Sequence, residues 1–496
     1  MRNAISPRLY NSLWYAAALA ACLVMWAVNR APLAYVDTGA YFAQGAASAD
    51  ALGLDLRRDA AAGAEGGGAS GSGQNDDVVT GSRSATYALF LTLATRALGA
   101  GAAPVLQSAL LVLAVFLTFR VASRTAPGAP QTAPQTAPAT ALAIGAACLG
   151  SAAFYTVYLM PDIFTPIMIL CLSALTLFAG VMRWWELLLS VLLAAWAVTT
   201  HPSHLLIAGL AVPAAILVAL AVRPRRGWLG IALVGLVAVA GLAERAAFKT
   251  VVETVQHAEV VYQPFLTVRF IVDGPGMDRL ADVCPSDTLA TCDLYAALED
   301  HPERIDASQI MFGKSDELGS FALLDGETQK RIAYEQSAFV SDVIRTHPVG
   351  VALAVLGNMV EQLETVSVVM TLPIDNTLDL MAAMTDELPQ VLWQSRLTQV
   401  PPWLDEVEAW HRILYRLSAV LVLALMVMPR AGPPARIRGF VAMVLLGVLA
   451  NALVCGGISQ PAERYGARVI FLLPMMLVVL LAYMPFWRRE RVPVAG

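Results

Sequence analysis

Two acidic residues, each set in a short aromatic motif, are the side chains best suited to chemistry. Asp37 lies between Tyr35 and Tyr41, and Asp162 follows a proline shortly after Tyr158. A carboxylate can serve as a general base, and two carboxylates at the same depth can share a divalent ion. The structural alternatives are a solvated loop acid for Asp37 and a helix N-cap for Asp162.

Histidine and arginine pairs form two further motifs. His201 and His204 are separated by Pro-Ser, and Arg464 lies four residues before Arg468. Residues at i and i+4 share a helix face, so the two arginines could bind a phosphate or pyrophosphate together. The histidines could bind phosphate or sugar, but two histidines need further ligands to hold a metal. The alternatives are a capped turn for the histidines and snorkelling to lipid headgroups for the arginines.

The composition is that of a membrane protein, and this sets the elements that must position these residues. The 496 residues are 57% hydrophobic and 14% charged, whereas soluble domains carry about 25% charge. Apolar runs of roughly 17 to 25 residues predict membrane-spanning helices. We therefore expect an all-α polytopic membrane protein with about ten spans, at 11–28, 103–121, 139–159, 163–180, 186–200, 205–222, 227–243, 413–429, 439–458 and 467–487.

Two further apolar segments are expected to lie along the membrane surface. The segment 349–370 contains Glu361 and Glu364, and each charge at mid-bilayer costs about 2.5 to 3.5 kcal/mol. This segment is therefore predicted to lie at the outer interface. The apolar segment 87–99 is too short to span the bilayer and has the same prediction.

Basic residues flank every second connection, which predicts the orientation. Because arginine and lysine favour the cytoplasmic side, both termini are expected inside and the motifs above outside. The arginines that carry this inference are Arg2, Arg8, Arg120, Arg124, Arg183, Arg223, Arg225, Arg226, Arg430, Arg436, Arg438, Arg488, Arg489 and Arg491.

Three regions follow from this pattern. Residues 1–243 form an N-terminal membrane module with a first outer loop at 30–85, and 244–412 form a small, mainly helical extracytoplasmic domain. Residues 413–496 form a C-terminal three-span module with a cytoplasmic tail. The outer domain is acidic, since residues 244–346 hold nine basic and eighteen acidic side chains.

The cysteines agree with an outer location of that domain. Cys284 and Cys292 lie in it eight residues apart, and a disulfide between them suits an oxidising compartment. A metal site there would need a third and fourth ligand that do not follow in the sequence. The other four cysteines fall within apolar spans, where they are expected to serve as packing residues.

Taken together, the motifs resemble those of GT-C fold glycosyltransferases, the superfamily of protein O-mannosyltransferases and lipid A aminoarabinose transferases. The resemblance rests on an acid after the first span, a proline–acid pair after the third, and Arg464-Tyr465-Gly-Ala-Arg468 opening the last. Arg83-Ser-Ala-Thr-Tyr87 is similar to the Arg-x-Pro-x-Tyr-Pro stretch of many members, although both prolines are missing, and Asp37 stands where an acidic pair is common.

The resemblance implies a transferase of the bacterial inner (plasma) membrane. It would move a sugar from a polyprenyl-phosphate donor to an envelope glycan or lipid acceptor, inverting the anomeric centre. Asp37 would be the catalytic base, and Asp162 would hold the acceptor or a divalent cation such as Mg or Mn. The outer domain would select the acceptor. Donor or acceptor binding is expected from Tyr41, Arg83, Tyr87, His201, His204, Glu463, Arg464, Tyr465 and Arg468.

Other functions fit the same composition. A transporter or flippase would place ionisable residues within the spans, whereas here they gather at the outer junctions. A glycan polymerase or ligase would use arginines of a late outer loop, for which Arg412 and Arg416 are available. A non-catalytic protein of the same fold would explain the missing motif residues. No nucleic-acid-binding motif or basic patch occurs.

Overall fold

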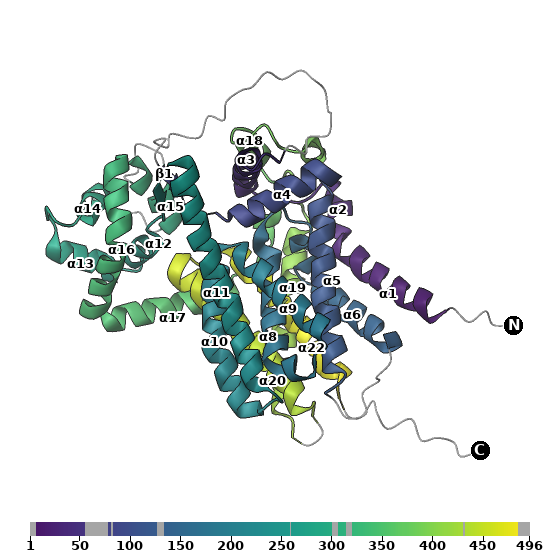
Figure 1. Ribbon diagram of the computed structural model, residues 1–496. Coiled ribbons are helices and arrows are strands. Elements are labelled where there is room, and N and C mark those ends of the chain that lie inside the picture. Colours follow the sequence, from purple (N-terminus) through teal and green to yellow (C-terminus); the bar gives the residue numbers. More distant parts are fainter. Residues whose placement is uncertain are drawn as a thin grey trace, which may run out of the picture.

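The computed structural model describes residues 6–54, 78–80, 83–125, 133–257, 259–299, 306–313, 320–429 and 432–484 (Figure 1). This part of the chain is almost entirely helical, and its two short strands, β1 (Val78–Thr80) and β2 (Glu259–Val261), pair in parallel. Arg2, Arg430 and the basic tail after residue 484, which helped to predict the orientation, lie outside the described residues.

Seven helices of the described chain are long and apolar enough to cross a membrane, and they match seven of the ten predicted spans. The protein is thus an all-α polytopic membrane protein. The seven comprise α5 (Ala102–Ala122), α8 (Phe164–Phe178) with its flanking 3-10 turns, α10 (Pro202–Val222), α11 (Gly227–Val251), α19 (Leu404–Val427), α20 (Ala435–Val454) and α21 (Glu463–Ile470) continued by α22 (Leu472–Ala482).

The predicted count of ten is not confirmed, because the other three apolar runs form shorter helices. Residues 11–28 are divided between α1 (Pro7–Cys22) and α2 (Val24–Asn29), and 139–159 between α6 (Ala133–Cys148) and α7 (Ala152–Tyr155). The run 186–200 lies in α9 (Trp184–Thr199). A helix of 16 residues is about 24 Å long, which is less than the roughly 30 Å of a bilayer core. An eighth span results only if the bent pair α16 (Gly326–Thr346) and α17 (Pro348–Glu364) is counted as one.

Helix α8 is the centre of the bundle. Every residue from Phe164 to Phe178 is buried, and α5, α9, α10, α11 and α20 pack around it. A helix that is apolar on all sides belongs either in such a core or in the membrane, and α8 occupies the core. By contrast, α10 and α11 expose leucines such as Leu217 and Leu236, as expected of helices that face lipid.

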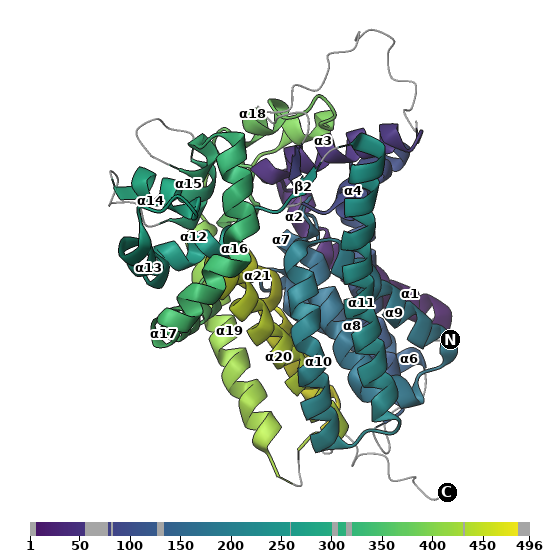
Figure 2. The same cartoon turned by 60° about the vertical axis from the view of Figure 1, so that its left-hand side comes forward.

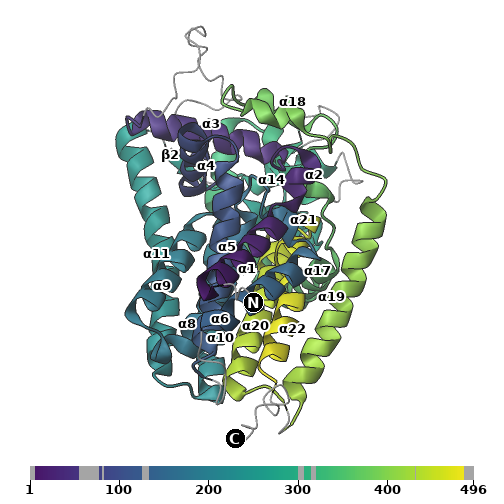
Figure 3. The same ribbon diagram turned by 90° about the vertical axis from the view of Figure 1, so that its right-hand side faces the viewer.

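Two helices of the first outer loop lie across one end of the bundle, and this layer positions the candidate site. They are α3 (Val36–Ala51) and α4 (Ala85–Leu98), while the α10–α11 and α19–α20 connections lie at the opposite, arginine-bearing end (Figures 2 and 3). The short helix α18 (Thr377–Ala382) covers α3, with Met381 packed against Gly39. The side chain of Asn29 accepts hydrogen bonds from the backbone N–H groups of Arg396 (3.1 Å) and Leu397 (2.9 Å), which holds this cover in place.

Beside this end of the bundle, five helices enclose a separate apolar core. They are α12 (Phe265–Val272), α13 (Pro275–Val283), α14 (Thr291–Glu299), α15 (Ala307–Phe312) and α16 (Gly326–Thr346). Leu280, Leu294 and Ile332 are fully or almost fully buried within the core. The expected limits of the outer domain, 244 and 412, fall inside helices, since α11 continues to Val251 and α19 begins at Leu404.

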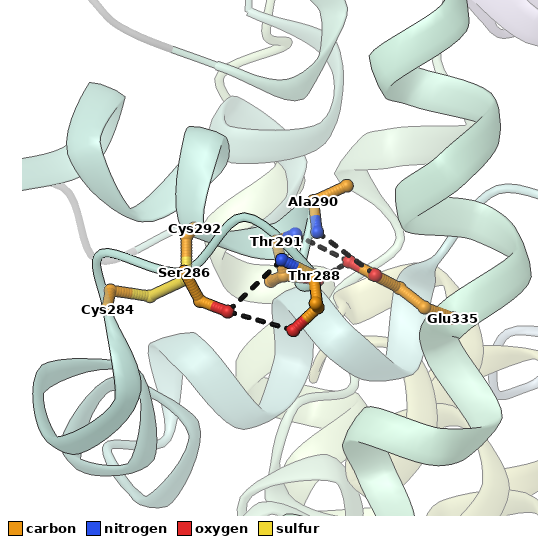
Figure 4. Close-up of a disulfide and its surroundings, with 7 residues drawn as sticks. All are labelled: Cys284, Ser286, Thr288, Ala290, Thr291, Cys292 and Glu335. Carbon is orange, nitrogen blue, oxygen red and sulfur yellow. Dashed lines mark hydrogen bonds between the residues drawn. A yellow bond between two sulfur atoms is a disulfide. The ribbon is translucent and has the colours of Figure 1, made fainter.

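Cys284 and Cys292, the pair expected from the sequence, are joined by a disulfide (Figure 4). The loop that it closes is tied to α16 through Glu335, whose carboxylate accepts hydrogen bonds from the backbone N–H groups of Ala290 (3.1 Å) and Thr291 (2.5 Å). The Thr291 hydroxyl donates a further bond to the same carboxylate at 2.6 Å. One covalent and three polar contacts therefore hold this part of the outer domain.

The contact between α3 and α4 depends on Gly45. A Cβ atom added there would lie 2.3 Å from the backbone oxygen of Ala88, so Gly45→Ala should separate the helices and lower the free energy of unfolding by about 1 to 3 kcal/mol. At Gly235 on α11, an added Cβ atom would have no neighbour within 4 Å. The control Gly235→Ala should leave stability unchanged or raise it by up to about 1 kcal/mol. Thermal unfolding in detergent measures both, and equal effects would refute the close-packing argument.

Candidate functional site

The candidate site forms where the N-termini of several helices meet beneath α3. Asp37 lies in the first turn of α3, and Asp162 lies in the 3-10 turn (Pro161–Ile163) that leads into α8. The free N–H groups and the dipole of a helix N-terminus stabilise a carboxylate at such positions. The backbone brings the segments that carry the two acids together, because Leu33 forms a parallel bridge opposite Tyr158. In this bridge the Leu33 N–H donates to the Val157 carbonyl at 3.0 Å and the Leu159 N–H donates to the Leu33 carbonyl at 2.8 Å.

Arg464, in the first turn of α21, lies between these two carboxylates. Its Nη1 donates to Asp37 Oδ2 at 3.5 Å, and its Nε lies 3.5 Å from Asp162 Oδ1. The rings of Tyr35 and Tyr465 flank the guanidinium at 5.5 and 5.0 Å. A buried cation is stable only when charges and polar groups compensate for its lost hydration, and this arrangement supplies both.

The ion pairs continue on both sides of Arg464. Arg83 Nη2 donates to Asp37 Oδ1 at 2.8 Å, and Arg468 Nη1 donates to Asp162 Oδ1 at 3.2 Å. We call this row of five residues the ion-pair chain: Arg83, Asp37, Arg464, Asp162 and Arg468. It contains three guanidinium groups and two carboxylates, so it carries one excess positive charge and favours an anionic ligand.

Arg468 has a structural position rather than a ligand-facing one. Its side chain is completely buried, and its Nη2 donates to Asn451 Oδ1 (2.9 Å) and Ser203 Oγ (3.0 Å). These contacts join α21 to α20 and α10. The sequence predicted a pair of arginines that bind one phosphate together, but in the structure Arg468 binds protein groups on every side.

The two acids differ in access. The Asp37 side chain is 34% exposed, whereas that of Asp162 is fully buried. Burial disfavours the ionised form of Asp37, but Arg83 and Arg464 outweigh this effect and lower its pKa below the usual value. Asp37 is therefore an ionised carboxylate at neutral pH. Of the two acids in the ion-pair chain, it is the one that a substrate can reach.

The two histidines have separate roles. The buried His204 holds the carbonyl of Ala197 with Nδ1 (2.7 Å) and the Thr165 hydroxyl with Nε2 (2.6 Å). A carbonyl can only accept, so Nδ1 carries the proton and the ring is engaged by the protein on both sides. His201 is the N-cap of α10, and its Nδ1 accepts from the backbone N–H of Ser203 at 3.2 Å.

The remaining predicted residues surround the ion-pair chain or lie beside it. Tyr41 and Tyr87 are buried in edge-to-face contact, with ring centres 5.1 Å apart, and burial raises the pKa of Tyr41, which stays protonated. Tyr87 donates to Gln107 at 3.0 Å. Glu463 begins α21, is half-buried near the carboxylate of Glu408, and forms no ion pair with the ion-pair chain among the described residues.

A small pocket is lined by Arg83, the ion-pair partner of Asp37, and the sequence did not predict most of its other lining residues. Arg83, His201, Glu244, Arg245 and Tyr262 line it, together with apolar residues of α9 and α11. Arg245 stacks on the Tyr262 ring at 5.5 Å, and Glu244 accepts a hydrogen bond from Thr86 at 3.2 Å. The available sequence signal was the acid–base pair Glu244-Arg245, which ends the apolar run of α11 at the predicted outer side.

A divalent ion shared by Asp37 and Asp162 would have to displace Arg464, whose guanidinium contacts both acids. Within the described residues, no group of three or more histidine, cysteine, aspartate or glutamate side chains is arranged to hold a metal. In the structure the position between the two carboxylates is thus filled by an arginine.

Comparison of the chain with known protein families, with curated proteins and with solved structures finds no match. The resemblance to GT-C enzymes therefore rests on the sequence motifs alone.

The buried end of the ion-pair chain should be essential for stability. Asp162→Asn removes the counter-charge of two buried arginines and should lower the free energy of unfolding by about 3 to 5 kcal/mol. Adding Arg468→Gln should cost less than the sum of the single losses, because the two residues share one interaction. Thermal unfolding of Asp162→Asn, Arg468→Gln and the double variant in detergent measures these losses.

The control is Asp342→Asn, which breaks the partly exposed ion pair with Arg279. It should lower the free energy of unfolding by no more than about 1 kcal/mol, and a loss equal to that of Asp162→Asn would refute the argument.

His201 should make stability depend on pH. Burial and the nearby His204, Arg468, Arg464 and Arg245 lower its pKa well below 6.5, so the folded protein keeps it neutral while the unfolded chain protonates it. Stability should therefore fall as the pH drops from 7 to 5, by at most about 2 kcal/mol for this residue. His201→Gln cannot titrate and should show a shallower loss. Apparent melting temperatures across this pH range measure the difference, and parallel curves would refute the assignment.

Proposed function

We propose that the protein is a membrane glycosyltransferase that moves a sugar from a polyprenyl-phosphate donor to an envelope glycan or lipid acceptor. The observation that carries the proposal is Asp37, an accessible carboxylate in the ion-pair chain, whose partner Arg83 lines a pocket together with Arg245. The site lies at the end of the bundle opposite the α10–α11 and α19–α20 connections, which carry arginines. We propose that this end is extracytoplasmic, that both termini are cytoplasmic and that the membrane is the bacterial inner membrane.

The pocket offers a place for the donor's phosphate. Arg83 is 36% exposed, and Arg245 forms no ion pair with another described residue, so both guanidinium groups can bind phosphate oxygens. His201, kept neutral, can exchange a hydrogen bond with the donor without adding charge. Arg464 and Arg468 contribute positive potential from behind and hold Asp162 in place.

In the proposed reaction, Asp37 accepts the proton of an acceptor hydroxyl whose oxygen attacks the anomeric carbon of the sugar. The bond between that carbon and the phosphate oxygen breaks, and polyprenyl phosphate leaves with the bonding electrons, stabilised by arginine. Arg83 links the two events: when it turns to the phosphate, Asp37 loses a cation that lowers its pKa and becomes a stronger base. A single displacement inverts the anomeric centre.

The deciding variant is Asp37→Asn, which keeps the shape of the side chain but cannot accept a proton. We expect the rate of transfer to fall by about 10²- to 10⁴-fold, so mass spectrometry of envelope glycans and glycolipids should show the same missing sugar mass as in a deletion strain. Wild-type protein should restore that mass.

Asp50→Asn is the matched control, because Asp50 is an exposed acid on the same helix, with only a 3.5 Å contact to Arg96. It should restore the wild-type masses at equal expression. Full restoration by Asp37→Asn would refute the catalytic role and favour a non-catalytic protein of this fold. An unchanged glycan profile in the deletion strain would refute the transferase and favour a transporter.

A further inference from the structure

Helix α17 (Pro348–Glu364) carries an exposed apolar stripe outside the candidate site. Val349, Leu353, Leu356 and Val360 are 69%, 65%, 56% and 56% exposed. Their spacing of four, three and four residues places them on one face of the helix. Large apolar side chains aligned and exposed in this way mark an interaction surface.

The opposite face of α17 is fixed to the bundle by polar and backbone contacts. Gln362 is fully buried, donates to the carbonyl of Ala462 at 2.9 Å and accepts from its N–H at 3.0 Å. Gly456, in the π-helical turn after α20, packs so closely that an added Cβ would lie 2.5 Å from the Asn358 oxygen. These contacts leave the helix no freedom to turn its stripe inward.

The direction of α17 suits a membrane surface. The chain bends by 106° between α16 and α17, and α17 runs across the direction of the spanning helices (Figures 1 and 2). It packs against α20, which is itself long and apolar enough to span. A helix held against a membrane-spanning neighbour lies at the edge of the lipid. The exposed Glu361 lies about 100° around the helix from Val360, outside the stripe, and the exposed Glu364, one turn beyond Val360, ends the stripe at the last residue of the helix.

We propose that α17 lies flat in the outer surface of the bilayer, with Val349, Leu353, Leu356 and Val360 inserted among the lipid acyl chains. The partner is thus the lipid bilayer itself, and the helix anchors the outer domain to it. An amphipathic helix gains its binding energy from this insertion while its polar flanks stay at the headgroup level. The proposal is independent of the enzymatic function.

Spin labels on the full-length protein in lipid nanodiscs test this. Nitroxides are attached at Leu353→Cys, Leu356→Cys and, as the control, Glu361→Cys, in a background with Cys148→Ala. Cys148 is replaced because the other free cysteines of the described chain are buried. Collisions of the label with oxygen, which dissolves in lipid, are compared with collisions with a water-soluble nickel chelate.

Oxygen should dominate by several-fold at 353 and 356, and nickel at 361. Dominance of nickel at 356 would overturn the proposal, because the stripe would face water. Exclusion of both reagents would also overturn it, because another protein would cover the stripe. Labels at Val349→Cys and Val360→Cys should report equal depth. A depth difference near 16 Å, the length of eleven helical residues, would show a helix that enters the bilayer end-on.

Discussion

The placement of Arg464 between Asp37 and Asp162 is the constraint on which the rest of the structure depends. A cation with only 7% of its side chain exposed must be neutralised, and neither acid is near it in sequence. The start of α3, the turn before α8 and the start of α21 must therefore meet at one point. Four neighbouring helices support this junction. Helices α4 and α18 cover it, and polar side chains of α10 and α20 bind Arg468 behind it.

Much of the membrane fold could be predicted from apolar runs alone, and two of the three spans that are not confirmed share one feature, a break in the helix. Seven predicted spans coincide with long helices. In lipid the backbone N–H and C=O groups must bond to each other, and a helix satisfies them within one segment. The run 11–28 is not confirmed as a span because the helix breaks at Leu23, a residue whose side chain gives no turn signal. Composition measures how apolar a segment is, whereas packing against neighbours decides where its backbone breaks.

The proximity of four of the five residues of the ion-pair chain was predictable from the sequence, but their contacts were not. Order and sidedness in the sequence placed Asp37, Asp162, Arg464 and Arg468 together, and the structure joins all four. Sequence could not show that Arg468 is enclosed by protein groups, because Asn451 and Ser203 become its partners only through tertiary packing. Arg245 was not predicted either. A basic residue at the end of a span ordinarily faces water, and only the tertiary structure shows that Arg245 lines the pocket.

The disulfide between Cys284 and Cys292 makes the redox state of this domain a marker of the compartment in which the domain folds. Such a bond forms and persists only where the surroundings are oxidising. The thiol state of this one pair, read without any fused reporter, thus distinguishes a domain that has crossed the membrane from one retained in the cytosol. The same chemistry means that protein produced in a reducing host compartment begins without this closure.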